Sequence, residues 1–246
     1  MKFTVIGYWH GYPGSGEATS SYLLEADGYR LLLDCGSGAM SQMQAYCAPE
    51  TLDAVIVSHY HQDHIADIGV LHYNRLINSK LGKSTNPLLL YGHREDEDEF
   101  KKLSYPPYVK AVAYQADGTI SIGPFQVSFC KTIHPKPCYA IRVEYNGYSL
   151  VYTADTSYFP ELSAFASETD LLVAEASFYE GQEAASFGHM TSKDAATVAS
   201  EAGAKQLLLT HLPHFGDHQQ LVREANAYYS GYVQTATAGL TLRFTP

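Results

Sequence analysis

Apolar and polar residues along the chain follow two spacings, one typical of buried strands and one typical of helices. Short runs rich in leucine, valine and isoleucine predict strands at residues 2–6, 21–25 and 30–34. Apolar residues recurring at helical intervals predict helices at residues 37–47 and 66–78. Strands and helices interleaved in this way indicate a mixed α/β protein.

The second half of the chain carries two turn signals, each between strand-like runs. One is Gly123-Pro124 and the other is Asn146-Gly147. Asn-Gly is typical of a type I′ turn, in which both central residues have positive φ. We therefore expect two hairpins here, the second spanning residues 139–151. A helix is predicted at 193–202, with Thr191 or Ser192 as its N-cap.

The segment His59-Tyr60-His61-Gln62-Asp63-His64 follows the apolar run 53–58 directly. A strand that ends there delivers three imidazoles and a carboxylate into one short loop. Zinc is bound by such nitrogen and oxygen atoms at roughly 2.0–2.2 Å, from several directions. A solvated polar loop is the alternative interpretation, but this spacing of ligand residues favours a metal site.

Three more metal-binding residue types stand where predicted strands end. His134 follows the run 125–133, Asp155 follows 148–154, and His211 ends the run 206–210. Taken one at a time, a loop histidine or a turn cap explains each of them. Together with the histidine-rich loop, they become candidate ligands.

The histidine-rich loop resembles the HxHxDH signature of the metallo-β-lactamase-fold hydrolases. The resemblance implies an α/β fold of the four-layer αββα sandwich type, here as a single domain of residues 1–246. It also implies a dinuclear metal site in which Asp155 bridges both ions. One ion would be held by His59, His61 and His134, and the other by Asp63, His64 and His211.

Neutral imidazoles and carboxylates without a thiolate suit zinc, so two Zn²⁺ ions are the expected cofactors. Manganese or iron can occupy the same ligand set. Asp34, in Leu-Leu-Leu-Asp-Cys-Gly, matches the early aspartate with which the family orients its ligand histidines. A loop cap is the competing interpretation of Asp34.

Gly188-His189-Met190-Thr191 resembles the Gly-His-Ser-Thr element of the ribonuclease Z (ELAC-like) phosphodiesterases. The resemblance implies that His189 stabilises or protonates the departing oxygen of a phosphodiester. It further implies that Glu175, in an element where the family has His-Glu-Ala-Thr, orients His189. Asp63 is expected to orient or deprotonate the attacking water as well as to bind metal.

Ribonuclease Z also carries a long basic arm that clasps tRNA, between its third histidine and its bridging aspartate. Positions 134 and 155 are only 21 apart here, and the predicted hairpin fills that interval. A net charge of -10 also argues against broad contact with nucleic acid phosphates. RNA, including a tRNA 3′ end, and a small cyclic or linear phosphodiester therefore both remain as substrates.

Two other function classes stay open. A metal-activated water also attacks carbonyl groups, so the same fold can serve an acyl or lactone hydrolase. Alternatively, the metals brace a binding protein without enzymatic activity. His189 and Glu175 count against the acyl or lactone hydrolase, and the full ligand set together with His189 counts against the binding protein.

The sequence also leads to expectations about cellular location, the redox state of the cysteines and oligomeric state. Nothing in the first residues resembles an export signal, and no apolar run is long enough to span a membrane. Four cysteines without zinc-ribbon spacing indicate reduced thiols and a cytoplasmic protein. A homodimer is expected only because ELAC-like relatives often form one.

Overall fold

The computed structural model describes residues 1–116 and 118–244, and the chain forms two compact units. Unit 1 consists of Met1–Gln115 and Thr237–Pro246, and unit 2 consists of Ala116–Ala236. Each unit contains one seven-stranded sheet. The expectation of a single domain stays a prediction.

The sheet of unit 1 has the strand order β14-β1-β2-β3-β4-β5-β6. Its strands are β1 (Lys2–Gly7), β2 (Ser21–Ala26), β3 (Tyr29–Leu33), β4 (Ala54–Ile56), β5 (Leu88–Gly92), β6 (Val109–Ala113) and β14 (Thr241–Arg243). Strands β3 to β6 run parallel, whereas β14, β1, β2 and β3 pair in antiparallel fashion. The carboxyl ends of β3 and β4 therefore lie at the same edge of the sheet.

The helical segments of unit 1 are short apart from one. They are α1 (Ala39–Gln42), η1 (Met43–Ala45), η2 (Pro49–Thr51), α2 (Gln62–Ile65), α3 (Ile68–Lys80) and α4 (Glu97–Lys102). The helix expected at 37–47 is shorter, because Gly38 precedes it with φ 81° and the chain tightens into 3₁₀ geometry at Met43. The expected helix 66–78 is α3, displaced by two residues.

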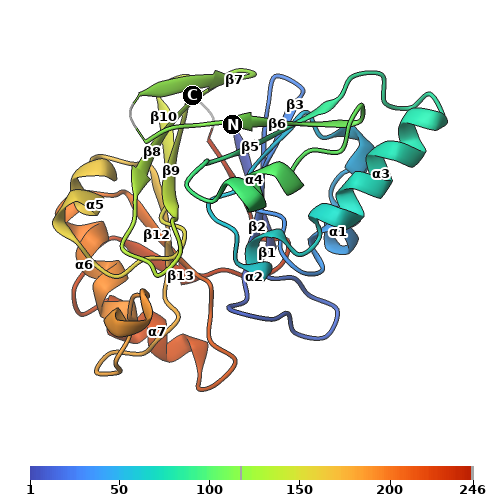
Figure 1. Ribbon diagram of the computed structural model, residues 1–246. Coiled ribbons are helices and arrows are strands. Elements are labelled where there is room, and N and C mark those ends of the chain that lie inside the picture. The colour runs from blue at the N-terminus through green and yellow to red at the C-terminus, as the bar shows by residue number, and fades with distance from the viewer. Residues whose placement is uncertain (117, 245–246) are drawn as a thin grey trace. The chain divides into compact units, whose positions relative to one another are not determined.

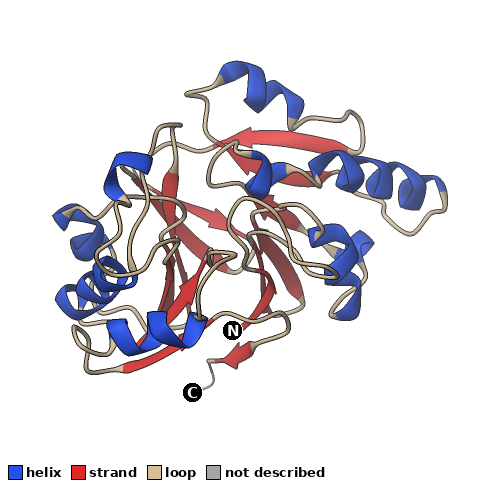
Figure 2. Ribbon diagram, turned by 90° about the horizontal axis from the view of Figure 1, so that it is seen from below, coloured by secondary structure: helices blue, strands red, loops and turns tan. Residues whose placement is uncertain are grey.

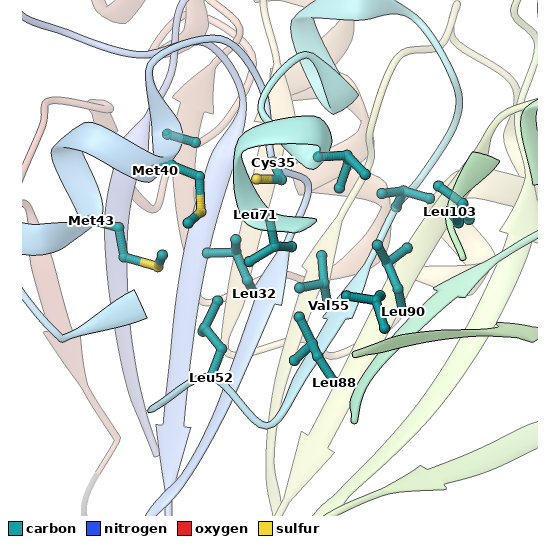
Figure 3. Packing of buried hydrophobic residues seen from close by; sticks show 14 of the residues in the cluster. Leu32, Cys35, Met40, Met43, Leu52, Val55, Leu71, Leu88, Leu90 and Leu103 are labelled. Carbon is teal, nitrogen blue, oxygen red and sulfur yellow. The ribbon is translucent and has the colours of Figure 1, made fainter. Parts of the chain in front are cut away.

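Side chains from the sheet and helices of unit 1 share one buried apolar cluster. Figure 3 shows Leu32, Val55 and Leu90 from neighbouring strands beside Leu71 from α3 and Met40 from α1. All five are at most 3% exposed. Burying a leucine side chain of this kind stabilises the fold by about 1.5–3 kcal/mol.

The sheet of unit 2 has the order β13-β12-β11-β10-β9-β8-β7. Its strands are β7 (Thr119–Ile122), β8 (Phe125–Lys131), β9 (Tyr139–Tyr145), β10 (Tyr148–Tyr152), β11 (Leu171–Glu175), β12 (Gln206–Thr210) and β13 (Tyr232–Thr235). Both expected hairpins are present. Asn146 and Gly147 have φ 48° and 79°, which confirms a turn with two positive-φ residues.

Strand directions in unit 2 gather several strand ends at one edge. Strands β10 to β13 are parallel, and β8 runs with them because both β8 and β10 are antiparallel to β9. The carboxyl ends of β8, β10, β11 and β12 therefore share an edge. These are the ends at which the sequence places candidate ligands.

Helices pack beside the sheet of unit 2 (Figure 1). They are α5 (Pro160–Phe165), the turn η3 (Ala185–Phe187), α6 (Ser192–Ala202) and α7 (His218–Ala225). Helix α6 contacts β11 and β12, and α7 contacts β13. Thr191 is the N-cap of α6 and forms a capping box with Asp194. Figure 2 shows the helices in blue and the strands in red. Within residues 1–116 and 118–244, no helix is long and apolar enough to cross a membrane.

Candidate metal centre

In unit 1 the histidine-rich loop begins just after β4 and continues into α2, bringing its candidate metal ligands together. His59 and His64 are fully buried, and their ring centroids are 4.2 Å apart. The ring of His61 lies 4.8 Å from that of His59. Asp63 Oδ2 lies 3.7 Å from His64 Nε2 and accepts a hydrogen bond from the Gly11 amide at 2.9 Å.

A close approach of backbone at Gly36 holds this loop in place. A Cβ atom at this position would lie 2.1 Å from the Asp63 carbonyl oxygen and 2.2 Å from Thr19 Oγ1. Only glycine avoids that clash. The neighbouring Cys35 amide donates to the His64 carbonyl at 2.8 Å, so the segment that follows β3 is tied to α2.

Asp34 stands directly after β3 and organises the loop through both carboxylate oxygens. Its Oδ1 accepts from the Ser58 amide at 2.7 Å. Its Oδ2 accepts from the Ser58 hydroxyl at 2.8 Å and contacts His64 Nδ1 at 2.7 Å. These bonds fit the orienting role expected for Asp34 rather than a simple loop cap.

In unit 2 the carboxylate of Asp155 lies between two of the predicted ligand histidines. Its Oδ2 is 3.9 Å from His134 Nε2, and its Oδ1 is 3.6 Å from His211 Nε2. Both distances exceed a hydrogen bond. They approach the roughly 3.4 Å that separates two ligands of one tetrahedral zinc ion. Each carboxylate oxygen therefore faces a different imidazole, as a bridging ligand requires.

His189 and Glu175 are paired in the same unit. His189 Nδ1 lies 2.9 Å from Glu175 Oε1, at the end of β11, and the glutamate is fully buried. The metal-binding atoms of Asp155, His189 and His211 all lie within 4.8 Å of one another. The pairing that the resemblance implies is thus present, and it sits beside two predicted metal ligands.

Gly188 serves this arrangement through its backbone. Its carbonyl oxygen lies 3.0 Å from His134 Nδ1. Its φ is 77°, and a Cβ would lie 2.5 Å from Pro135 Cδ. The glycine of the Gly-His element therefore lets the chain approach His134 closely enough to hold its ring.

The Nδ1 contacts of the histidines determine whether their Nε2 atoms can bind a divalent cation. Each Nδ1 of His59, His64, His134, His189 and His211 faces an oxygen atom at 2.7–3.1 Å. An imidazole whose Nδ1 donates presents its lone pair at Nε2, which is how metal-binding histidines are usually held. These residues fit zinc.

Sequence reasoning missed two buried hydroxyl groups in these networks. Ser58 lies between Asp34 and His59, and Ser177 lies between Glu175 and His211. Ser58 ends the apolar run 53–58, and Ser177 stands where the family element His-Glu-Ala-Thr has threonine, another hydroxyl residue. A hydroxyl residue beside a ligand histidine was the available signal.

Comparison with known proteins identifies the family. A model of the β-lactamase superfamily domain matches residues 29–212, which is most of the chain. The chain therefore belongs to the β-lactamase superfamily. The expected α/β fold class, the αββα sandwich of the metallo-β-lactamase fold, is confirmed by this match and by a solved structure.

Individual relatives and solved structures are similar to this chain over nearly its whole length. YhfI of Bacillus subtilis (strain 168), a probable metallo-hydrolase, is 48% identical across 97% of this chain and 98% of its own. Its crystal structure has a TM-score of 0.97 to this chain over 98% of each. Ribonuclease Z of Myxococcus xanthus (strain DK1622) is 27% identical across 98% of this chain and 97% of its own. The short form of human tRNase Z (ELAC1) shares the fold, with a TM-score of 0.80 at 21% identity over 100% of both chains.

Proposed function

We propose that this protein is a metal-dependent phosphodiesterase with two zinc ions as cofactors. The observation that carries the proposal is the buried His189–Glu175 pair at 2.9 Å, beside the predicted ligands Asp155 and His211. An imidazole held in this way is suited to a leaving oxygen that needs a proton. The resemblance of the Gly188-His189 element to that of the ribonuclease Z-like phosphodiesterases favours phosphodiester over acyl or lactone hydrolysis.

The proposed ligand assignment is the one that the resemblance implies. Asp155 bridges the two ions, and the contacts of its two oxygens with different histidines in unit 2 support this role. The remaining ligands are His59, His61 and His134 for one ion and Asp63, His64 and His211 for the other. Zinc is favoured over manganese because the set is rich in imidazole, and iron is the alternative that accepts the same ligands.

Each residue has a defined task in the proposed reaction. When bound, the two cations would acidify a water molecule and neutralise charge on the phosphoryl oxygens. Asp63, held by the Gly11 amide, orients that water. His189 presents Nε2 to the departing oxygen, because Glu175 occupies its Nδ1. Glu175 is itself fixed by the Thr156 amide, which donates to Oε1 at 2.7 Å.

RNA and small phosphodiesters are both proposed substrates. The 27% identity to a ribonuclease Z favours RNA, including a tRNA 3′ end. Against a large RNA stand the net charge of -10 and the β9–β10 hairpin, which fills the interval where the tRNA-binding arm would be. A small cyclic or linear phosphodiester needs neither an arm nor a basic surface.

The deciding experiment combines metal analysis with a panel of substrates. Zinc content is measured, and rates are compared for a bis-aryl phosphodiester, cyclic nucleotides, pre-tRNA and a lactone. We expect about two zinc ions per chain. We also expect every productive substrate to be a phosphodiester. A lactone cleaved faster than all the phosphodiesters would refute the proposal, and bound metal without any hydrolysis would indicate a metal-braced binding protein.

A homodimer and a cytoplasmic location remain predictions. The surface that we expect a dimer to bury is the exposed face of α3 and the residue after it, which presents Val70, Tyr73, Ile77 and Leu81. None of these four is charged, so an interface formed there would bury apolar surface without burying a charge. Ile77→Glu should convert a dimer to a monomer in sedimentation velocity, with Lys101→Glu as the surface control. A wild-type monomer would refute the dimer.

A further inference from the structure

Each unit contains a fully buried carboxylate that contacts one imidazole directly and a second imidazole through a serine hydroxyl. In unit 1, Asp34 contacts His64, and Ser58 lies between Asp34 and His59. In unit 2, Glu175 contacts His189, and Ser177 lies between Glu175 and His211. We call these two sets the Asp34 relay and the Glu175 relay.

Hydrogen-bond directions in the two relays follow from the number of protons available. An ionised carboxylate can only accept, and a serine hydroxyl has a single proton to give. Ser58 Oγ lies 2.8 Å from Asp34 Oδ2, and Ser177 Oγ lies 2.7 Å from Glu175 Oε2. Each serine therefore donates to its carboxylate and can only accept from the neighbouring imidazole.

The imidazole must then carry its proton on Nδ1. The Nδ1 atoms of His59 and His211 lie 3.1 Å and 2.9 Å from the hydroxyls of Ser58 and Ser177. Ser177 Oγ also lies 3.2 Å from the His211 carbonyl oxygen. Donation to that carbonyl gives the same result, because the hydroxyl proton again points away from Nδ1.

We propose that Ser58 and Ser177 are positioning residues of the metal centre, which fix His59 and His211 in the tautomer that offers Nε2 to a cation. Each serine hydroxyl connects its carboxylate to a second imidazole. Asp34 and Glu175 then each set the orientation of two histidines. This inference rests on the proposed metal site but is independent of which ester the protein cleaves.

The test compares Ser177→Ala with Ser177→Thr in the zinc-loaded full-length protein. Threonine keeps a hydroxyl, as in the family element. Removing such a supporting partner typically weakens metal affinity by roughly 10- to 100-fold. We expect that loss in zinc affinity for Ser177→Ala, measured by chelator competition, and recovery in Ser177→Thr. The Nδ1–H signal of His211 in imidazole ¹H–¹⁵N spectra should weaken through solvent exchange in the alanine variant only.

Matched controls separate this role from general stabilisation. Ser163 donates to Glu201 at 2.7 Å and is also buried, but among the described residues no hydrogen bond joins that pair to a histidine. Ser163→Ala should leave zinc affinity and the His211 signal unchanged. Ser58→Ala and Ser58→Thr repeat the test in unit 1, where the Nδ1–H signal of His59 should respond instead. Either serine alone can therefore test the proposal if the alanine variant of the other does not fold.

The outcomes discriminate clearly. Alanine variants that keep wild-type zinc affinity and sharp Nδ1–H signals for His59 and His211 would overturn the proposal. So would equal losses in the alanine and threonine variants, because the hydroxyl would then be irrelevant. A protein that passes this test yet cleaves no phosphodiester would refute the proposed function and leave the relays intact.

Discussion

Three residues at the candidate site have left-handed backbone although none is glycine. Asp34, Ala154 and His211 have φ values of 56°, 51° and 53°. Such a conformation costs of order 1–3 kcal/mol and persists only where the surroundings enforce it. Each stands where a strand has just ended and turns the chain toward a buried polar group. These are three of the six non-glycine residues with positive φ in the described part of the chain.

Replacement of His189 by alanine tests the leaving-group role at this scale. We expect zinc content to stay near wild type and turnover of esters with poor leaving groups to fall by about 10²–10⁴-fold. Esters with an aryl leaving group should suffer much less, because that oxygen departs without a proton. Steady-state kinetics and metal analysis check this, and a matching loss of zinc would contradict the assignment.

Asp155→Ala addresses the bridging ligand. Its two oxygens face His134 and His211, so its removal should lower metal content and activity together. Asp170→Ala is the control, because Asp170 is also a buried aspartate but its carboxylate pairs with Lys205 and not with a histidine of the candidate site. Full zinc occupancy in the Asp155 variant would show that the aspartate does not bridge.

Among the elements, α6 has the most complete set of start and stop signals. Thr191 and Asp194 form a capping box at its N-terminus, and Gly203 ends it with φ 65°. Its buried face, which includes Ala195, Val198 and Ala199, packs on β11 and β12. The helix therefore fixes the position of the loop that precedes it, which carries His189.

Thr191→Ala should lower the free energy of unfolding by about 1 kcal/mol, because one N-terminal amide of α6 loses its acceptor. Thr191→Ser should retain most of the stability. Urea denaturation measures both. An unchanged midpoint and slope in the alanine variant would mean that the cap contributes nothing to the fold.

At the scale of the whole molecule, the proposed metal ligands are spread along the chain between positions 59 and 211. A cation that binds only folded chain stabilises it by about 2.7 kcal/mol at a concentration 100 times its Kd. That corresponds to a rise in Tm of roughly 5–10 °C for a chain of this size. Calorimetry of zinc-loaded and chelator-treated protein should show this shift. Asp155→Ala should not show it, and an equal Tm with and without metal would argue against a site of this kind.

The sequence predicted most of the ligand-bearing elements because their signals are local. The Asn146-Gly147 turn and the apolar runs before His59 and His211 depend only on neighbouring residues. Helix α7 was not predicted because it contains few apolar residues. Strand β14 was not predicted because it is only three residues long and pairs with β1, which is distant in sequence. The hydrogen bonds of the two relays could not be predicted even with the serines in view, because they join residues from separate strand ends.

Strand β14 has a consequence for how the polypeptide is completed. It pairs with β1 at the edge of the first sheet, so unit 2 is an insertion between β6 and β14. On the ribosome, β14 is synthesised after unit 2, so β1 lacks this neighbouring strand up to that point. Until then the hydrogen-bonding groups of β1 stay open to a neighbouring nascent chain, and loss of residues 237–246 would make that aggregation hazard permanent.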